Sequence, residues 1–150
     1  MRVVIQRVSK ASVTIDNQIY GAIQQGYVIL LGIETKDTLE GSDWLCKKIV
    51  ALRVFSDLEG KMNRSITDIK GECLVISQFT LHAETKKGNR PSFIKAARPE
   101  QAIPLYEAFI SRLQQSLTMP VKTGKFGANM KVGLMNDGPV TIIIDSKAKE

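Results

Sequence analysis

The sequence is poor in the side chains that most enzymes use for acid–base and metal chemistry. Its 150 residues include one histidine, His82, and two cysteines, Cys46 and Cys73. No segment matches the phosphate-binding, zinc-protease or serine-hydrolase motifs. The two cysteines provide neither a disulfide framework nor metal-ligand spacing, so they are predicted to be small buried side chains in a reduced compartment. We therefore expect neither a metal nor another cofactor.

A targeting signal and a membrane span are also missing. Gln6, Arg7 and Lys10 interrupt the apolar N-terminal segment, which excludes the continuous apolar region of a signal peptide. Nowhere do about 18 apolar residues follow one another, as a transmembrane helix requires. Together with the absence of linkers and repeats, this predicts one cytoplasmic domain over residues 1–150, with no membrane partner.

The single histidine is badly placed to act as a catalytic base. On the predicted strand Leu74–Leu81, Thr80 and His82 would share a face but lie about 6.6 Å apart, whereas a nucleophile and its base need about 3 Å. His82 is instead predicted to be a solvated residue at the end of the strand. The carboxylates close to Gly or Asn are predicted to form turns rather than acid–base pairs; they are Asp57, Glu59, Asp68, Glu72 and Asp137.

Positive charge, by contrast, is in excess. The chain has 21 Lys and Arg against 15 Asp and Glu, for a net charge of +6, which favours a polyanionic partner without identifying it. Cations concentrate in residues 85–99 and 122–131, where Phe93 and Phe126 lie among them. This pattern suits phosphate contacts combined with base stacking. A solvated loop is the alternative for either segment taken alone.

Hydrophobic periodicity predicts an α+β domain, with a curled, barrel-like and mostly antiparallel sheet and two main helices. The predicted strands are "VVIQRV" paired with "ASVTID", then "YGAI", "YVILLGI", Leu74–Leu81, Met130–Met135 and Val140–Ile144. One helix is expected over Ser42–Phe55 with Ser42 as its N-cap, and the other after Pro99, delayed or kinked by Pro104. The nearly continuous apolar run "VTIIID" needs cover on both faces, either from a partner subunit or from its own chain.

Two short segments stand out at the ends of predicted strands. In "NDGPVT" (Asn136–Thr141), Asp-Gly is typical of a hairpin turn, but the following proline removes a donor where the second strand would begin to pair. "SQFTL" (Ser77–Leu81) follows a buried strand. Free backbone amides there would stabilise an oxyanion without any acid or base side chain, although an ordinary edge strand has the same composition.

Motifs along the whole length make the sequence similar to the D-aminoacyl-tRNA deacylases, formerly called D-tyrosyl-tRNA deacylases. The segments that match, in the family's order, are "MRVVIQRV", "GKMNRSI", "SQFTL", "KKGNRPSF", "GKFGANM" and "NDGPVT". The resemblance implies a homodimeric hydrolase that cleaves the ester between a D-amino acid, or glycine on tRNA-Ala, and the 3′-terminal adenosine of tRNA. The implied partners are the acceptor end of aminoacyl-tRNA and a second copy of the chain.

The resemblance also assigns roles to individual residues. Phe79 and Thr80 are the implied catalytic residues. The implied substrate-binding residues are Arg7, Ser77, Gln78, Phe126, Gly127, Ala128, Met130, Asn136, Gly138, Pro139 and Thr141. A cis Gly138–Pro139 peptide, held by Arg7, would point its carbonyl groups into the partner's active site. These carbonyls would accept hydrogen bonds from the substrate ammonium, so that an L side chain would clash with the loop.

Alternatives remain for both mechanism and function. The family is thought to use the ribose 2′-hydroxyl of its substrate, with backbone amides around Phe79 and Thr80 as oxyanion donors; Thr80 as the nucleophile is the rival mechanism. The competing functions are a non-catalytic tRNA- or DNA-binding module and an esterase for small molecules.

Overall fold

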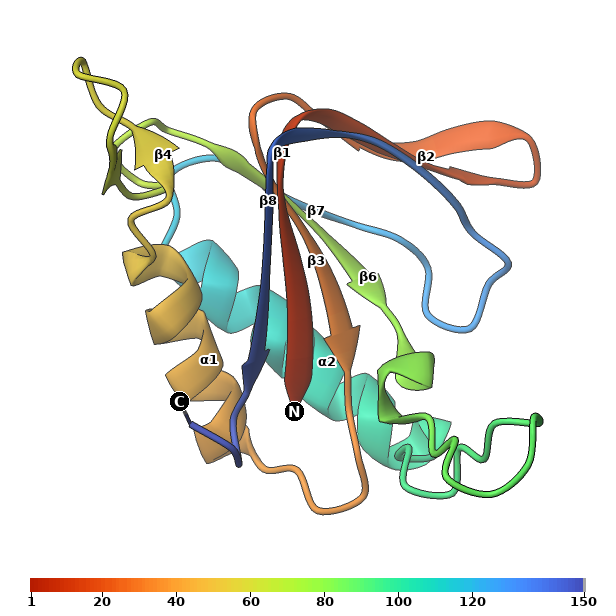
Figure 1. Ribbon diagram of the computed structural model, residues 1–150. Helices are drawn as coiled ribbons and strands as arrows, with labels where there is room; N and C mark the ends of the chain where they lie inside the picture. The colour runs from red at the N-terminus through yellow and green to blue at the C-terminus, as the bar shows by residue number, and fades with distance from the viewer. Residues whose placement is uncertain (150) are drawn as a thin grey trace.

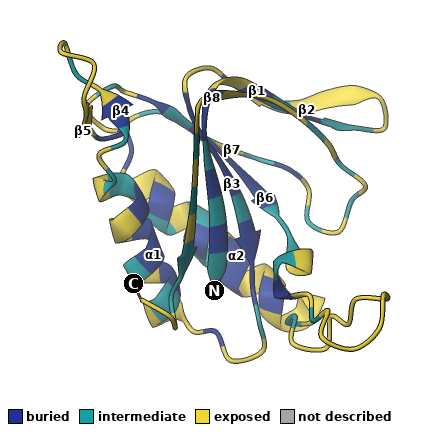
Figure 2. Ribbon diagram, in the orientation of Figure 1, coloured by how far each residue is buried: buried dark blue, intermediate teal, exposed yellow. Residues whose placement is uncertain are grey.

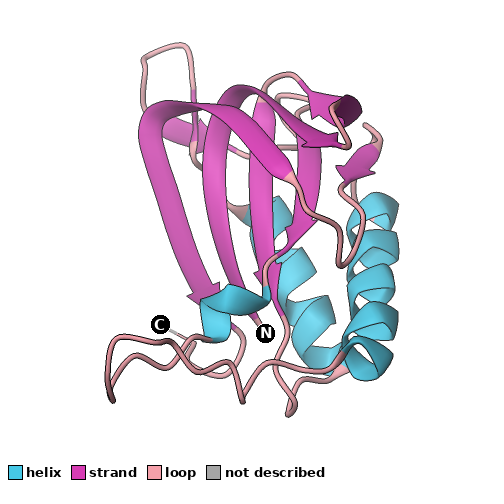
Figure 3. Ribbon diagram, turned by 90° about the vertical axis from the view of Figure 1, so that its right-hand side faces the viewer, coloured by secondary structure: helices cyan, strands magenta, loops and turns pink. Residues whose placement is uncertain are grey.

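In the computed structural model, which describes residues 1–149, two α-helices pack against one face of a curled six-stranded sheet, and two short strands form a separate pair (Figure 1; Figure 3). The elements in chain order are β1 (Arg2–Ile15), β2 (Gln18–Ile23), β3 (Gly26–Gly32), α1 (Leu39–Ala51), β4 (Phe55–Ser56), β5 (Met62–Arg64), β6 (Glu72–Ser77), the 3₁₀ helix η1 (Phe79–His82), α2 (Pro99–Gln115), β7 (Val121–Thr123) and β8 (Lys131–Asp145). The predicted α+β class, with a barrel-like sheet and two main helices, is confirmed.

The sheet is mixed in direction. Its order is β2-β1-β3-β6-β7, with β8 paired to β1. The three partners of β1 run antiparallel to it, whereas β3 pairs with β6 and β6 with β7 in parallel. Parallel neighbours need long crossover connections, and these contain α1 and α2. The carboxyl ends of β3, β6 and β7 therefore lie along one edge of the sheet.

Alternating side chains divide the apolar residues between two faces of the sheet. On β3, Tyr27, Ile29 and Leu31 belong to the main core, which α1 and α2 cover. Val28 faces the other side, inside the curl, in a smaller cluster with residues of β1, β2 and β6. Figure 2 shows buried residues on the central strands and on the inner faces of both helices. Each fully buried aliphatic side chain contributes about 1.5–3 kcal/mol.

Each of the two longest strands combines two segments that the sequence pattern separates. "VVIQRV" and "ASVTID" form one continuous strand, β1, rather than a pair, and "MKVGLM" and "VTIIID" are both parts of β8. The two strands run antiparallel along their whole length, from Arg2 opposite Asp145 to Thr14 opposite Lys131. The hairpin that Asp-Gly alone would favour does not form: β1 supplies ladder partners on both sides of "NDGPVT", so the chain does not reverse there.

The helix boundaries also differ from the prediction. α1 begins at Leu39, because the Thr38 hydroxyl caps it by accepting a hydrogen bond from the Gly41 amide at 3.4 Å. Ser42, the predicted cap, is buried within the helix. α2 begins at Pro99, a position where the missing amide proton is not needed, and it continues through Pro104 without the expected delay.

The chain leaves the sheet earlier than predicted after the third central strand. β6 ends at Ser77, and the next residues form η1 instead of continuing the strand. This turn folds His82 inward, so its side chain is 4% exposed, with Nδ1 3.8 Å from Glu34 Oε2. The prediction of a solvated histidine is therefore wrong. Both cysteines, in contrast, are buried and free as expected.

The outer strand β8 leaves apolar side chains uncovered. Ile143 is 68% exposed and Met135 is 54% exposed, whereas Ile142 and Ile144 pack against the main core. One subunit therefore covers only one face of the segment "VTIIID". Within residues 1–149, no helix has the length and apolar character needed to cross a membrane.

Candidate active site

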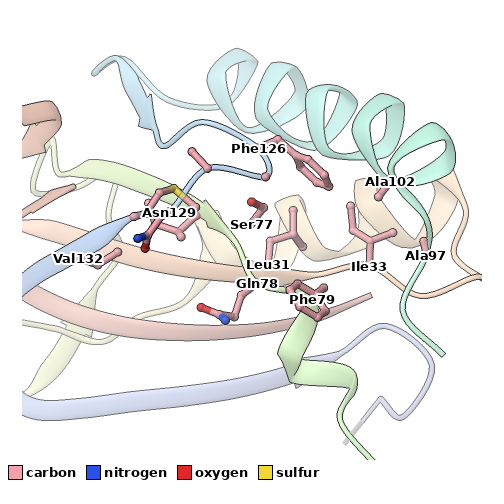
Figure 4. A pocket seen from close by; sticks show the side chains of 14 residues that line it. Leu31, Ile33, Ser77, Gln78, Phe79, Ala97, Ala102, Phe126, Asn129 and Val132 are labelled. Carbon is pink, nitrogen blue, oxygen red and sulfur yellow. The ribbon is translucent and has the colours of Figure 1, made fainter. Parts of the chain in front are cut away.

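A cavity of about 270 Å³ opens at the sheet edge where the parallel strands end (Figure 4). It lies beyond the carboxyl ends of β3 and β6, between η1, the start of α2 and the loop from β7 to β8. Its lining residues are Leu31, Ile33, Ile76, Ser77, Gln78, Phe79, Ala97, Ala102, Phe126, Gly127, Ala128, Asn129, Met130 and Val132. Crevices at the carboxyl ends of parallel strands are general ligand sites in α/β sheets.

One wall of the cavity is the end of β6 and the start of η1. The Gln78 amide donates to the Leu31 carbonyl at 2.8 Å, which continues the β3–β6 ladder by one bond and fixes the segment. The next two amides, of Phe79 and Thr80, donate to no backbone oxygen within residues 1–149. Two adjacent donors are thus available at the point where the strand turns away from the sheet.

The opposite wall is the turn that contains Phe126 and Met130. The ring of Phe126 packs edge-on against Tyr106 of α2, with centroids 5.6 Å apart. The Tyr106 hydroxyl donates to the Val75 carbonyl at 3.2 Å, and burial raises the pKa of Tyr106 to about 12. The Gly124 amide donates to the same carbonyl at 3.2 Å. A Cβ on Gly124 would lie 2.3 Å from the Met130 sulfur, so a larger residue there would displace the Met130 side chain.

None of the fourteen lining residues carries a titratable side chain. Thr80 is exposed and does not line the cavity; its hydroxyl accepts a hydrogen bond from Gln78 Nε2. His82 is buried, and its Nδ1 is directed toward Glu34 rather than toward the threonine. Residues 1–149 hold no group of three or more His, Cys, Asp or Glu arranged for a metal ion. The cavity therefore offers apolar walls, small polar groups and backbone donors.

The segment "NDGPVT" forms a wide bulge on β8. Val8 of β1 pairs with Asn136 and Gln6 pairs with Thr141, so the four residues 137–140 stand opposite Arg7 alone. The peptide bond between Gly138 and Pro139 is cis. Bulges interrupt the ladder and redirect the strand, which explains why proline is tolerated here without a backbone donor.

Arg7 fixes the base of this bulge. Its side chain is 11% exposed; Nε donates to the Asp137 carbonyl at 2.9 Å and Nη1 to the Val54 carbonyl at 2.5 Å. Gly138 adopts φ +131°, a region that L residues rarely enter, and a Cβ there would lie 2.9 Å from Arg7 Nη2. The arginine and the glycine therefore fit each other closely.

The structure brings the predicted site residues into two places rather than one. Ser77, Gln78 and Phe79 share the cavity with Phe126, Gly127, Ala128 and Met130. The second group is Arg7 together with the exposed residues Asn136, Gly138, Pro139 and Thr141, none of which lines that cavity.

Sequence patterns did not identify several of the lining residues. Leu31 and Ile33 belong to a run that reads as ordinary core. Ala97 and Ala102 flank the start of α2, where their small side chains leave room for the cavity. The only sequence signal for them is the position of an apolar run and of two alanines beside the motif segments.

Known proteins are similar to this chain over nearly its whole length. The sequence profile described as D-Tyr-tRNA(Tyr) deacylase matches residues 4–145. Curated proteins named D-aminoacyl-tRNA deacylase are similar over all 150 residues and over their own full length, with 66% identity in Bacteroides fragilis and 62% in Flavobacterium psychrophilum.

Two solved structures are similar to this chain as well. A structure titled c-Myc DNA Unwinding Element Binding Protein superposes with a TM-score of 0.92 at 43% identity, covering 97% of this chain and 98% of that one. A probable eukaryotic D-amino acid tRNA deacylase shares the fold, with a TM-score of 0.78 at 15% identity, over 95% and 97% of the two chains. From the matched profile and the full-length relatives, we conclude that the chain belongs to the D-aminoacyl-tRNA deacylase family of hydrolases.

Proposed function

We propose that the chain hydrolyses the ester of D-aminoacyl-tRNA, and of glycine wrongly attached to tRNA-Ala, in the cytoplasm, releasing the free amino acid and tRNA. The observation that carries this proposal is the cavity, in which "SQF" and "FGANM" form opposite walls without a titratable group. Such a site suits a substrate that brings its own reactive group. It does not suit a reaction that depends on a protein acid or base.

The walls suggest how the substrate lies. Phe126 and Met130 provide an apolar face for the terminal adenine, and the adjoining Gly127 and Ala128 leave space beside it. The ester would then reach Ser77 and Phe79 across the cavity. Phe126 is fixed by Tyr106, so the base would meet a preorganised surface.

The free amides of Phe79 and Thr80 are the oxyanion donors in this proposal. Water attacks the ester carbonyl, and the negative charge that develops on the carbonyl oxygen is stabilised by these two amides. The ribose 2′-hydroxyl of the substrate orients the water. In this proposal Thr80 is not the nucleophile, because its hydroxyl accepts a hydrogen bond from Gln78 Nε2 and the Nδ1 atom of His82 faces Glu34 instead.

A second copy of the chain completes the site. Gly138 and Pro139 are exposed on β8 and away from the cavity of their own subunit. The same strand exposes Ile143 and Met135, and an outer strand of 15 residues with uncovered apolar side chains is a natural surface for association. In the homodimer, the Gly138 and Pro139 carbonyls of one protomer would accept hydrogen bonds from the substrate ammonium in the other.

Selection then works by exclusion. An L-aminoacyl group would direct its Cβ into the Gly138–Pro139 unit, whereas a D-aminoacyl group would direct it away. Glycine has no Cβ and would pass. Incubation of the purified protein with D-tyrosyl-tRNA, L-tyrosyl-tRNA and glycyl-tRNA tests the proposal, which expects release from the first and third only. Release from L-tyrosyl-tRNA at the D rate, or complete resistance of glycyl-tRNA, would contradict selection by clash.

One comparison favours a second candidate function. The solved structure at 43% identity is titled as a DNA-unwinding-element binding protein, and the net charge of +6 suits a nucleic acid. A non-catalytic binding module would bind DNA or tRNA in a salt-sensitive manner without cleaving any ester. An unspecific esterase, the third alternative, would hydrolyse both tyrosyl enantiomers and also small aminoacyl esters. The same incubation separates all three.

A further inference from the structure

A basic hairpin stands next to the mouth of the cavity. Glu84 and Ser92 pair through two backbone hydrogen bonds, of 2.8 Å and 3.0 Å, and so close the loop 85–91. The hairpin follows η1 directly and precedes Phe93. Figure 1 shows the loop extending away from the sheet beside η1.

Two exposed aromatic rings connect this hairpin to the cavity. Phe79, which lines the cavity, is 56% exposed, and Phe93 is 36% exposed. Their rings meet edge to face with centroids 5.1 Å apart. The Phe93 carbonyl accepts a hydrogen bond from the Ala96 amide at 3.0 Å, and Ala97 lines the cavity. Phe93 is thus held against the lining residue Phe79, with part of its ring open to solvent.

The hairpin carries uncompensated positive charge. Lys86, Lys87 and Arg90 are all exposed, and the loop between Glu84 and Ser92 contains no carboxylate. Glu84 itself is paired with Lys95 at 2.5 Å. No ion pair of residues 1–149 involves the three hairpin cations.

This juxtaposition of an aromatic surface and free cations points to a second nucleotide subsite. We infer that Phe93 stacks the base that precedes the terminal adenosine, while Lys86, Lys87 and Arg90 contact the phosphates of the single-stranded 3′ end. Aromatic stacking combined with a basic groove is the general mode of single-strand recognition. The inference rests on the proposed function, because it takes the terminal adenosine to occupy the cavity.

The aromatic surface favours a single strand over a duplex, because stacking needs a base whose face is open. A duplex hides the faces of its bases, so it offers Phe93 nothing to stack on. A protein partner with acidic side chains would use the cations but not an aromatic surface at the cavity mouth.

The test compares substrates of different length. D-tyrosyl-adenosine fills only the cavity, whereas the trinucleotide ester D-tyrosyl-CCA also reaches the subsite. The quantity measured is the kcat/KM for D-tyrosyl-CCA divided by the kcat/KM for D-tyrosyl-adenosine. It is compared between the wild type and Phe93→Leu, which keeps an apolar side chain against Phe79 but removes the ring. Ile94→Ala, at a neighbouring position that is 80% exposed, is the matched control.

We expect the ratio to fall about tenfold in Phe93→Leu, within the range for loss of one stacked base, and to keep its wild-type value in Ile94→Ala. A ratio in Phe93→Leu equal to that of the wild type overturns the inference, because the loss would then come from a displaced Phe79 or would not exist. Absence of any hydrolysis by the wild type would instead refute the proposed function.

If the wild type hydrolyses neither ester, binding measurements test the subsite separately. The probes are D-tyrosyl-3′-amino-adenosine and the corresponding CCA trinucleotide, both with an amide in place of the ester. For two phosphates, the logarithm of the binding constant should fall with the logarithm of the salt concentration with a slope of about 1.4. Replacement of Lys86, Lys87 and Arg90 by alanine should remove most of this slope for the trinucleotide. If the triple substitution leaves the slope for the trinucleotide unchanged, or lowers the slope only for whole tRNA, the inference is overturned.

Discussion

Substitution of Gly138 by alanine tests the fit between the bulge on β8 and Arg7. The added Cβ would lie 2.8 Å from Val140 Cγ2, 2.9 Å from Arg7 Nη2 and 3.0 Å from the Val140 nitrogen. One of these contacts is with backbone, so a side-chain rotation does not relieve them all. The residue would also keep φ +131°, a conformation that costs an L residue about 1–3 kcal/mol.

The expected loss of stability is therefore about 2 kcal/mol. For a domain of this size, that lowers Tm by about 4–8 °C. Arg7 must move as well, which displaces the carbonyls of the Gly138–Pro139 unit. We therefore expect the ratio of D-tyrosyl-tRNA to L-tyrosyl-tRNA hydrolysis to fall at least tenfold, which corresponds to about 1.4 kcal/mol of discrimination.

Thermal unfolding followed by circular dichroism, together with hydrolysis of the two enantiomers, measures both effects. Gly133→Ala on the same strand is the matched control, since its Cβ would meet only Ser12 Oγ at 3.8 Å and should change stability by less than about 0.5 kcal/mol. If Gly138→Ala melts together with this control and keeps the wild-type enantiomer ratio, the bulge neither needs glycine nor sets selectivity.

Three further predictions concern single side chains. Thr80→Val should retain turnover within a few-fold of wild type, because the backbone amide is kept; a complete loss of kcat with intact substrate binding would make the hydroxyl a catalytic group. His82→Asn should lower the free energy of unfolding by about 1–3 kcal/mol, through a changed buried contact near Glu34, but leave the shape of the pH–rate profile unaltered; a changed profile would show that the histidine acts in the reaction. The third prediction concerns Asp145. Burial by itself would raise the pKa of its carboxyl, but the Lys147 amide and Arg2 hold that pKa below its usual value. Stability from this group is then present above about pH 3.9 and lost as the pH falls through the lower folded-state value. Asp145→Asn should be less stable than wild type by up to about 1 kcal/mol at pH 7 and equal to it at pH 2, and an equal deficit at both values would contradict this sign.

Local sequence signals predicted the element types well but not how the elements join. The alternation in β1 and the helical spacing after Pro99 determine strand and helix, and both are present. The hairpin expected at Asp-Gly does not form, because continuous pairing with β1 is a long-range property that the turn residues do not reveal. His82 was misplaced for the same kind of reason, since the 3₁₀ turn that buries it depends on close packing against Gly32.

The site shows a similar division. The motif segments "SQFTL" and "GKFGANM" could be singled out from the sequence, and they meet in one cavity because parallel strands end side by side. Ala97 and Ala102 gave no chemical signal, since their contribution is the space they leave. The sequence shows Phe93 only as an aromatic residue among cations, with no sign of its contact with Phe79. Its position against Phe79 depends on the hairpin closed by Glu84 and Ser92.

Mixed dimers show whether one protomer supplies the filter for the cavity of the other. Ala128→Tyr fills the cavity but leaves the bulge on β8 intact, whereas Gly138→Ala alters the bulge and leaves the cavity intact. After subunit exchange between the two variants, half of the dimers contain one site with an intact cavity facing an intact bulge. We expect D-selective hydrolysis of tyrosyl-tRNA to be weak or absent in each variant alone. In the mixture it should return to about a quarter of the wild-type level. A mixture no more D-selective than the sum of its components would contradict it.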